Sequence, residues 1–470
     1  MVERHDEQGI GYYQSVEYFG EKTKLQASIE LQLIIAILAN QETAIASLIN
    51  GSHCEDAKHP RQSMFDWNVF YKLVIQHRVW YQVAATLSIY TKPSGQNLVP
   101  ATVVAGLLVQ VQNLDARCNQ DKLRMLAVVA ETVRISKLFQ KQNILHAFLK
   151  GVTLNVQLYP ELISRTCKDI DLWVSADCYQ QALDILIHLG YQQTIPQYTL
   201  SGFKKKYYLA HRHDIEFHHR QRNVFVELHF QINYHEVVAF YPLAPQMLRK
   251  VSILNVPVYT LNNELELLYL MIHGAIHAYT RLRWLYDVAL YIKSGRCDIE
   301  KLYTYARELQ SEHVVSLAVV LLKEVFKLEV PRTDNTIACI TSVQGKKLAD
   351  IVIYLLQNEY ELLGSSNVWS RGFFAYRKYV LLLAVKGKKV DAVLNDLFKI
   401  DLLFPSIVLP DRLAFLYYVI YPFWIIWHLV GSVWYIIKWI PDSAYKVAKL
   451  MSGMTFHGLS KIRNIFRIKS

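Results

Sequence analysis

Two kinds of hydrophobic spacing divide the chain. From about residue 22 to residue 142, apolar residues recur at every third or fourth position, as in LQLIIAILANQETAIASLIN, and Gly and Pro are almost absent from the interiors. Residues 261–405 show the same spacing. Because an α-helix has 3.6 residues per turn, this pattern predicts helices in both regions.

The region from residue 143 to residue 260 has a different pattern. KDIDLWV alternates polar and apolar residues, which is typical of a strand, and HDIEFHH and NVFVELHF predict two paired strands joined at RQRN. A helix is expected from Asp177 to Leu189, ending at Gly190. Strand, helix and hairpin together predict an α+β fold, in which a small mixed-sheet core is inserted between helical N- and C-terminal regions.

These patterns predict four parts of the chain. They are an N-terminal helical domain (22–142), the core (143–260), a second helical domain (261–405) and an apolar helical segment with a basic tail (406–470). Of the 470 residues, 52% are hydrophobic and 19% are charged. A large buried core is therefore expected, and intrinsic disorder is excluded as the state of the whole chain.

Charge and cysteine spacing narrow the partners and the compartment. A formal net charge of +11 favours partners that carry phosphate, namely a nucleotide, a nucleic acid or an anionic membrane, without choosing among them. The six cysteines are widely spaced and form no C-x-x-C pair, which argues against the usual zinc spacings and a disulfide framework. The N-terminal residues lack an apolar signal segment. A reducing cytoplasm is the simplest compartment.

The sharpest candidate site is the pair Asp169 and Asp171. On a strand, residues two apart point to the same face at about 6–7 Å, while Ile170 and Leu172 point to the opposite, apolar face. Two carboxylates this close repel each other unless a cation lies between them. Mg²⁺ (or Mn²⁺) prefers oxygen ligands and completes its shell with water and substrate phosphates. A D-x-D pair also fits a solvated strand edge, so the surrounding residues have to decide between that and a metal site.

A third carboxylate is expected on a neighbouring strand. Glu227 has apolar residues on both sides, so it is a polar residue forced into a central strand. Glu216 or Asp214 on the preceding strand is the alternative, and Glu227 could instead pair with a nearby Arg or His. With Asp169 and Asp171, Glu227 would complete a two-metal site of the kind that phosphoryl and nucleotidyl transfer require.

Several separated segments carry a resemblance to a known family. FLKGVTLNVQLYPELISRTCKDIDLWV, then a helix ending LGY, then VFVELHFQI, resembles the bacterial uncharacterised nucleotidyltransferase family of the DNA polymerase β superfamily. IQHRVWYQVAATL and LLYLMIHGAIHAYTRLRWLYDVAL resemble further motifs of that family, in the same order. The resemblance covers roughly Asp66 to Lys293. It implies a short mixed sheet backed by helices, which binds a nucleoside triphosphate and two divalent metal ions.

The resemblance also implies roles for individual residues. They are Asp169, Asp171 and Glu227 as catalytic metal ligands, Gly151 in the nucleotide loop, and Lys150 and Arg165 as phosphate contacts. Two departures affect the phosphate loop. Val152 follows Gly151, where the superfamily has Gly or Ser, and the gap from Gly151 to Asp169 is longer than usual.

A row of polar residues at steps of three and four predicts one face of a single helix. The row comprises His273, His277, Arg281, Trp284 and Asp287. Gly274 stands where the H-E-x-x-H motif has its glutamate, which argues against zinc hydrolase chemistry. The row could be a buried polar seam bonded to Asp287 or the core. It could also face the nucleotide or the acceptor, and the resemblance favours this second interpretation, with His273, His277 and Arg281 as nucleotide-binding residues.

The C-terminal region is the most apolar part of the chain. Residues 413–437 contain no Asp, Glu, Lys or Arg, which is long enough to span a bilayer, and a basic tail follows. A single crossing with a cytoplasmic tail would place the nucleotide site outside, away from its substrate. An interfacial or re-entrant hairpin, or a helix pair buried against the rest of the protein, is therefore favoured. The first predicts peripheral membrane contact through residues 413–440, at the inner face of the membrane.

These observations predict a metal-dependent nucleotidyltransferase. It would move a nucleotidyl group from a nucleoside triphosphate, with ATP as the first choice, to a hydroxyl or phosphate acceptor. The expected acceptor is a small molecule, a glycan or a peptide, and nucleic acid is less favoured because no long basic helix stands out. The alternative is a non-catalytic nucleotide-binding or membrane-associated assembly protein on the same fold.

Overall fold

The computed structural model describes most of the chain, and all structural statements below concern the part it describes. The described residues are 27–51, 65–92, 101–234, 238–331, 342–358, 371–385 and 399–425. They belong to two compact units. The first unit reaches residue 200 and resumes from 209 to 394, and the second contains residues 201–208 and the chain from residue 395. The two units are described separately.

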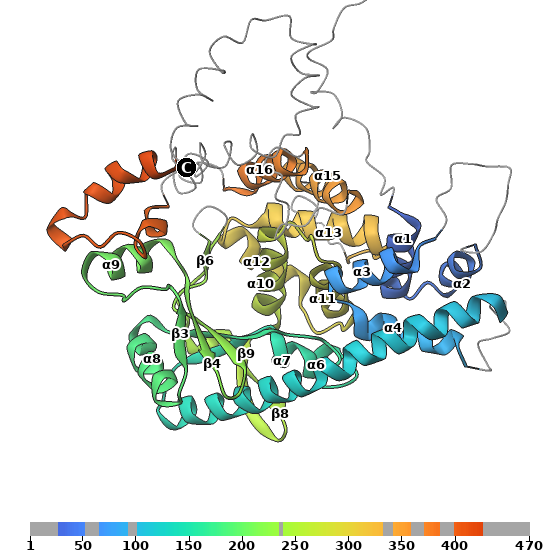
Figure 1. The fold of residues 1–470 in the computed structure, drawn as a ribbon, viewed down its shortest axis with the longest axis horizontal. Helices are drawn as coiled ribbons and strands as arrows, with labels where there is room; N and C mark the ends of the chain where they lie inside the picture. The colour runs from blue at the N-terminus through green and yellow to red at the C-terminus, as the bar shows by residue number, and fades with distance from the viewer. Residues whose placement is uncertain are drawn as a thin grey trace, which may run out of the picture. The chain divides into compact units, whose positions relative to one another are not determined.

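A mixed sheet of five strands forms the centre of the first unit (Figure 1). Its order is β1-β2-β5-β4-β3, with β1 (His146–Leu149), β2 (Asp169–Val174), β3 (Gln192–Ile195), β4 (Asp214–His219) and β5 (Val224–His229). Strands β2 and β5 are parallel, and the other neighbours are antiparallel. Helical regions precede and follow the sheet, so the predicted α+β fold with a small mixed sheet between helices is confirmed.

The strand register separates a polar face of the sheet from an apolar one. Asp171 lies opposite Glu227 on β5 and opposite Leu149 at the end of β1. Because strand residues alternate between faces, Ile170 and Leu172 lie on the other side, where both are buried. The predicted alternation of KDIDLWV therefore brings carboxylates of two neighbouring strands onto one face.

The N-terminal helical region ends in one long helix. Its helices are α1 (Ile29–Ala39), α2 (Glu42–Gly51), α3 (Trp67–His77), α4 (Trp80–Tyr90) and α6 (Ala101–Lys141). The side chains of Ser28 and Asp66 accept hydrogen bonds from the first turns of α1 and α3, which is typical of N-caps. Helix α6 packs against α4 and also against β2 and β5, as Figure 1 shows.

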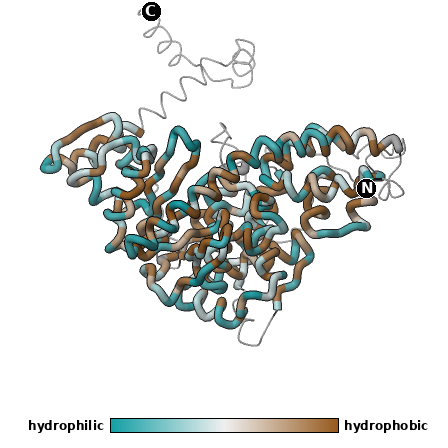
Figure 2. Tube along the Cα trace, turned by 90° about the horizontal axis from the view of Figure 1, so that it is seen from below, coloured by the Kyte–Doolittle hydropathy of each residue, from teal (hydrophilic) through white to brown (hydrophobic). Residues whose placement is uncertain are grey.

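The remaining elements of the first unit connect the sheet to the later helices. They are α7 (Gly151–Leu158), η1 (Ala176–Cys178), α8 (Tyr179–His188), β6 (Asn233–Tyr234), β7 (Val238–Ala239), η2 (Pro245–Met247), the hairpin β8 (Leu248–Ile253) and β9 (Val256–Leu261), α10 (Asn263–Ile276), α11 (Leu282–Lys293), α12 (Ile299–Glu308), α13 (Glu312–Phe326), α15 (Val343–Gln357) and α16 (Arg371–Leu383). One hydrophobic core joins α1, α3 and α4 to α10, α11, α13 and α15. Figure 2 shows apolar (brown) and polar (teal) stretches alternating along the described chain.

The prediction of a single helix through residues 273–287 is wrong. Helix α10 ends at Ile276, and α11 begins at Leu282. Between them Ala278 (φ 48°) and Tyr279 (φ 44°) adopt left-handed backbone conformations, which interrupt the helical hydrogen bonds. His273 therefore lies in the last turn of α10 and Asp287 lies on α11.

The second unit is organised around a small aromatic cluster. Helix α9 (Gly202–His211) starts in this unit, and its Phe203 stacks on Tyr417 with ring centroids 6.2 Å apart. Asp411 Oδ1 accepts a hydrogen bond from the Phe203 amide at 3.1 Å, near η4 (Asp411–Leu413), and η3 (Ile400–Leu403) precedes Phe404 of the same cluster.

The prediction of membrane contact through residues 413–440 is only partly within the described chain, because residues 426–470 lie outside it. Among the helices that the structure describes, none combines the length and the apolar character needed to cross a bilayer.

Candidate functional site

A cavity of about 920 Å³ lies in the first unit, and the polar face of the sheet forms one side of it. We call this side the strand wall; it comprises Asp169, Asp171, Asp214, Glu227 and His229. Helices and the residues at their ends contribute a second set of lining residues, which we call the helical wall: Arg78, Trp80, Arg117, His277, Arg281 and Trp284. Lys150, Arg165, Lys168 and Arg283 also line the cavity. Cations therefore outnumber carboxylates around it, which suits an anionic ligand.

The strand wall centres on a buried ion pair. Lys150 Nζ lies 2.8 Å from Asp171 Oδ1, and both side chains are largely buried. Lys150 follows directly after β1, and its left-handed backbone (φ 40°) lets the side chain reach the neighbouring strand β2. Burial alone would lower the pKa of Lys150, but the carboxylates of Asp171, Asp169 and Glu227 together outweigh it and raise the pKa. For Asp171, burial raises the pKa, and Lys150 and His229 more than reverse this effect.

His229 lies between two carboxylates. Its Nε2 atom is 3.6 Å from Asp171 Oδ1 and 3.7 Å from Glu227 Oε2, distances that make these ionic contacts rather than hydrogen bonds. Burial opposes a charge on the ring, but the two carboxylates raise the pKa of His229 to about 10. The pKa of Glu227 is also raised, to about 8, but here burial contributes to the rise together with the nearby Asp171. The strand wall therefore neutralises its own carboxylates with Lys150 and protonated His229.

The same residues fit a divalent cation, which would replace the proton on His229, because imidazole binds a metal ion in its neutral form. Asp171, Glu227 and His229 each offer one ligand atom, and these three atoms lie within 4.8 Å of one another. Among the described residues, this is the group of possible metal ligands. Of the buried Asp171 carboxylate, Oδ1 faces Lys150 Nζ at 2.8 Å, and Oδ2 has no hydrogen-bond partner within the described chain. An orphaned buried acceptor is costly, and carboxylates suit Mg²⁺ and Mn²⁺. Asp169, predicted as a ligand, lies outside this group but lines the same cavity.

The predicted choice of Glu227 over its rivals agrees with the strand order. Glu227 lies directly opposite Asp171, because β5 is the neighbour of β2. Glu216 lies opposite Glu227 on β4, one strand further from Asp171, and Asp214 lies opposite His229. The register therefore brings Glu227 closer to Asp171 than either alternative.

Gly151 begins helix α7 beside the two carboxylate strands. It has a left-handed backbone (φ 62°), and open space surrounds the position that a Cβ atom would take. No side chain caps the first amides of α7, and Thr153 Oγ1 instead donates to the Lys150 carbonyl at 2.8 Å. Uncapped amides at a helix N-terminus are able to bind phosphate oxygens.

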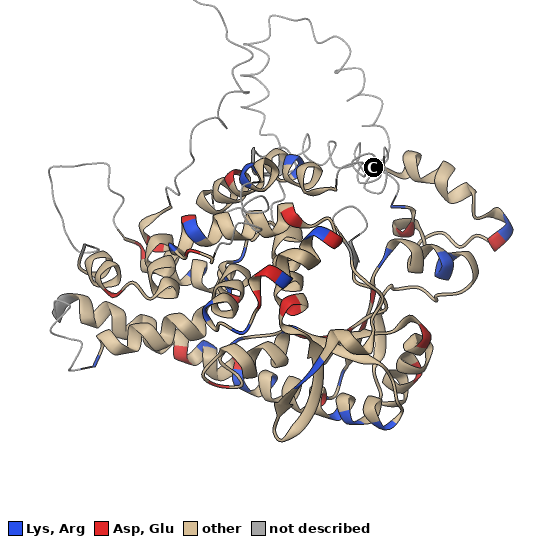
Figure 3. Ribbon diagram, turned by 180° about the vertical axis from the view of Figure 1, so that it is seen from behind, with Lys and Arg blue, Asp and Glu red and all other residues tan. Residues whose placement is uncertain are grey.

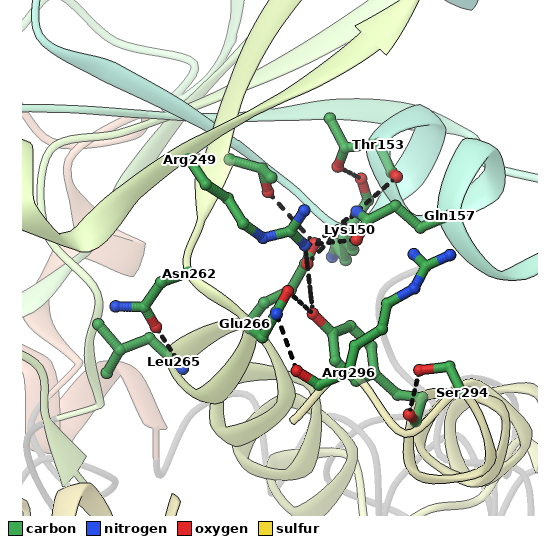
Figure 4. A network of polar contacts seen from close by, with 12 residues as sticks. Lys150, Thr153, Gln157, Arg249, Asn262, Leu265, Glu266, Ser294 and Arg296 are labelled. Carbon is green, nitrogen blue, oxygen red and sulfur yellow. Dashed lines mark hydrogen bonds and ion pairs between the residues drawn. The ribbon is translucent and has the colours of Figure 1, made fainter. Parts of the chain in front are cut away.

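A buried polar network holds α7 from behind (Figure 4). Glu266 of α10 accepts hydrogen bonds from Tyr291 at 2.9 Å, from Thr260 at 3.2 Å, and from Gln157 of α7 at 3.3 Å. Arg249 of β8 pairs with Glu266 and donates to Gln157. Burial raises the pKa of Glu266, and Arg249 acts against this rise. The network fixes α7 to α10 and to the β8–β9 hairpin.

Arg165, predicted as a phosphate contact, is committed to a partner in the protein. Its Nε and Nη2 atoms each lie 2.8 Å from one carboxylate oxygen of Asp287, and Tyr159 donates to the same carboxylate at 2.5 Å. Arg165 and Asp287 are both buried. Asp287 therefore binds Arg165 and Tyr159 in place of the histidines expected in a polar seam.

The predicted histidines lie beside the turn between α10 and α11. The His277 ring stacks on Trp284 with centroids 4.7 Å apart, and Arg281 lies 5.3 Å over the Trp284 ring. Burial lowers the pKa of His277 to about 4 and that of His273 well below its usual value. Both rings are therefore neutral near pH 7, and with Arg281 they line the cavity.

Packing explains why glycine occupies position 274, between His273 and His277. A Cβ atom there would lie 2.3 Å from the Tyr279 ring, closer than real contacts allow. The Tyr279 hydroxyl donates to the Met271 carbonyl at 3.1 Å, so the ring folds back onto α10. The motif thus shapes the turn that follows the helix.

Sequence reasoning missed several cations of the cavity and underused His229. The missed cations line the cavity without any signal beyond their charge; they are Arg78, Arg117, Lys168 and Arg283. His229 carried a usable signal, because it lies two residues after Glu227 and therefore on the same strand face.

The sequence model of a family described as "Uncharacterised nucleotidyltransferase" matches residues 63–327, more than half of the chain. The chain belongs to this nucleotidyltransferase family. The matched segment contains all the cavity-lining residues named above, from both walls. No curated protein matches the chain.

Proposed function

We propose that this nucleotidyltransferase moves a nucleotidyl group from a nucleoside triphosphate, with ATP as the first choice, to a hydroxyl or phosphate acceptor. The observation that carries the proposal is the group of Asp171, Glu227 and His229 on adjacent strands, open to a cavity rich in Arg and Lys. The acceptor is proposed to be a small molecule, a glycan or a peptide.

Each residue of the strand wall has a proposed role. Asp171, with Asp169 and Glu227, would hold Mg²⁺ or Mn²⁺, and the ion would neutralise charge on the triphosphate. Lys150 and the first amides of α7 would bind phosphate oxygens. In the reaction, the acceptor oxygen forms a bond to the α-phosphorus, the bond from that phosphorus to pyrophosphate breaks, and pyrophosphate leaves. Alternatively, Glu227 in its ionised form would take the acceptor proton instead of holding the metal ion.

We also infer kinship with the DNA polymerase β superfamily and a bacterial type of nucleotidyltransferase. Support comes from the mixed sheet with carboxylates on the parallel neighbours β2 and β5, and from the loop at Lys150 and Gly151 that leads into a helix. Membership of that superfamily would require metal ligands on strands and a phosphate loop at the start of a helix, and both are proposed here.

The test is pyrophosphate release from radiolabelled nucleoside triphosphates, with Mg²⁺ or Mn²⁺, in the presence of cell-extract acceptors or of water alone. Asp171→Asn and Glu227→Gln should each lower the rate by at least about a hundredfold, the scale on which transition-state charge stabilisers act. Asp184→Asn on the exposed surface of α8 is the matched control and should leave the rate unchanged. Equal rates in Asp171→Asn and the natural protein would refute the proposal.

One observation favours the non-catalytic alternative. Lys150 pairs with Asp171 at 2.8 Å and so supplies the charge that a metal ion would otherwise provide. A protein that binds nucleotide without turning it over would keep such a pair closed. Calorimetry with ATP, with and without Mg²⁺, combined with mass spectrometry for pyrophosphate, separates the two: binding that is insensitive to Mg²⁺ and yields no pyrophosphate supports the alternative.

Nucleic acid as the acceptor remains the less favoured proposal. Figure 3 shows Lys and Arg dispersed over many of the described elements rather than along one helix. Binding to RNA or DNA that weakens steeply with salt would support it, because each phosphate contact releases counterions.

A further inference from the structure

Arg78 is one of the cations of the cavity that the reaction proposed above does not use. It follows α3 directly, in a left-handed backbone conformation (φ 56°, ψ 44°) that ends the helix. Its amide bonds the Ile75 carbonyl at 3.1 Å, and the Val79 amide bonds the Val74 carbonyl at 3.2 Å. This turn directs the chain into α4 and leaves Arg78 lining the helical wall.

Within the described chain, the Arg78 guanidinium has no hydrogen-bond or ion-pair partner, although the side chain is half-buried. Burial lowers its pKa to about 10, and the charge of Arg281 adds to this effect, while Asp169 opposes it. An arginine stays charged at that pKa. A partly desolvated charge without a partner is costly, and an anionic ligand would remove that cost.

A second contact brings Arg281 to the same wall. The Leu282 amide, at the start of α11, donates to His77 Nδ1 at 3.3 Å. Because His77 precedes Arg78 and Leu282 follows Arg281, this one hydrogen bond places both arginines at the junction of α3 and α11. Arg281 lies over the Trp284 ring at 5.3 Å, which orients its guanidinium along the cavity.

We propose that Arg78 and Arg281 form a phosphate-binding site on the helical wall, separate from Lys150 and Gly151, which takes a phosphate group of one of the two substrates. The inference rests on the proposed nucleotidyl transfer for the identity of those substrates. Two like charges held side by side favour a ligand with more than one negative charge, and guanidinium groups match the oxygen geometry of phosphate.

The phosphate has two conceivable sources with the same chemistry. It belongs either to the pyrophosphate end of the nucleotide or to a phosphorylated acceptor. A transferase has to hold two substrates, and a cavity of about 920 Å³ is at the upper end of the range for small-molecule sites, so it has room for both.

The experiment measures anion binding without turnover. Pyrophosphate, a non-hydrolysable ATP analogue and inorganic phosphate are titrated calorimetrically into the full chain, the last also in the presence of saturating analogue. The variants are Arg78→Gln, Arg281→Gln and the charge-preserving Arg78→Lys. Arg296→Gln, which removes an exposed charge outside the cavity, is the matched control. Far-UV circular dichroism verifies that each variant is folded.

We expect Arg78→Gln and Arg281→Gln to weaken binding roughly 10- to 100-fold, the value of one charge-assisted hydrogen bond, and Arg78→Lys to weaken it less. Weakened pyrophosphate and analogue binding would assign the site to the nucleotide. Weakened inorganic phosphate binding only in the presence of analogue would assign it to the acceptor. Unchanged affinities of both Gln variants for all three ligands, at the level of Arg296→Gln, would overturn the inference.

The outcome is independent of the proposed function. If the natural protein never releases pyrophosphate but Arg78→Gln still weakens anion binding, the transferase proposal fails and the phosphate site stands. If turnover is observed and anion binding is unaffected by Arg78→Gln, only the phosphate site fails.

Discussion

The two walls of the cavity are built in opposite ways. The strand wall gathers charges that neutralise one another, with Lys150 and protonated His229 set against Asp171 and Glu227. The helical wall holds cations without carboxylates and positions them through buried contacts such as the Leu282–His77 hydrogen bond. The histidines show the contrast, since the pKa of His229 is raised to about 10 and that of His277 is lowered to about 4. The residues proposed for metal binding and catalysis lie on the strand wall, whereas backbone turns and packing contacts position the residues of the helical wall.

The largest effect is expected at the buried ion pair of Arg165 and Asp287. Arg165→Met should destabilise the protein by about 3–5 kcal/mol, because the buried Asp287 carboxylate loses its cation. Urea unfolding followed by circular dichroism measures the loss, and the exposed Arg296→Met is the control. The double variant Arg165→Met/Asp287→Leu should be more stable than Arg165→Met alone. A loss below about 1 kcal/mol for the single variant would mean that Arg165 is available to a ligand after all.

Gly274→Ala tests whether the turn of the helical wall depends on close packing. The added Cβ would meet the Tyr279 ring at 2.3 Å, so the ring has to move at a cost of about 1–3 kcal/mol. Thermal unfolding measures the loss. Gly106→Ala in α6, where the Cβ would lie 3.4 Å from Trp67, should leave stability equal or higher. Equal stability of the Gly274 variant and the natural protein would show that the turn adapts.

The pH dependence of His77 should sharpen the contrast with the strand wall. Burial lowers the pKa of His77 to about 4 from the ordinary 6.5, with Arg281 contributing. The folded state then binds fewer protons than the unfolded state between these values, so stability falls as pH decreases from 6.5 to 4. At pH 5 the loss should be about 2 kcal/mol. His77→Gln should remove this part of the slope in urea unfolding at pH 7 and pH 5, whereas an unchanged slope would contradict the assignment.

The smallest effect is expected at the network that fixes α7 to α10 and to the β8–β9 hairpin. Glu266→Gln keeps several hydrogen bonds of the network in Figure 4 but loses the ion pair with Arg249. Stability should fall by about 1 kcal/mol, and nucleotide affinity should change less than tenfold, because α7 stays attached through Gln157. Calorimetric titration of a non-hydrolysable nucleotide measures the second quantity. If Glu266→Gln weakened nucleotide binding more than Arg78→Gln does, this network and not Arg78 would determine phosphate binding.

The strand wall was predictable because its information is local. The alternation around Asp169 and Asp171, and the apolar neighbours of Glu227, assign faces without knowledge of the fold. The register then brings Asp171 and Glu227 together on neighbouring strands. The predicted sheet and its helical surroundings follow from the same periodicities.

The turns that form the helical wall were not predictable, because residues other than glycine adopt left-handed backbone conformations in them. Ala278 and Tyr279 end α10 where the sequence continues a helical pattern, and Arg78 ends α3 where Gly or Asn would be the usual signal. The partner of Arg165 is 122 residues away along the chain. Contacts of this separation have no local signature, so the role of Arg165 in binding Asp287 became apparent only in the folded chain.

Helix α6 has a consequence for how ligands enter the cavity. Its 41 residues form a rod about 60 Å long, which contacts α4 at one part and the strands β2 and β5 at another. Arg117 of the helical wall belongs to this rod. Any separation of the two walls that moved α4 away from the sheet would have to bend a continuous helix. Entry through a fixed opening, with exchange of side-chain positions alone, is therefore the less costly route for a substrate.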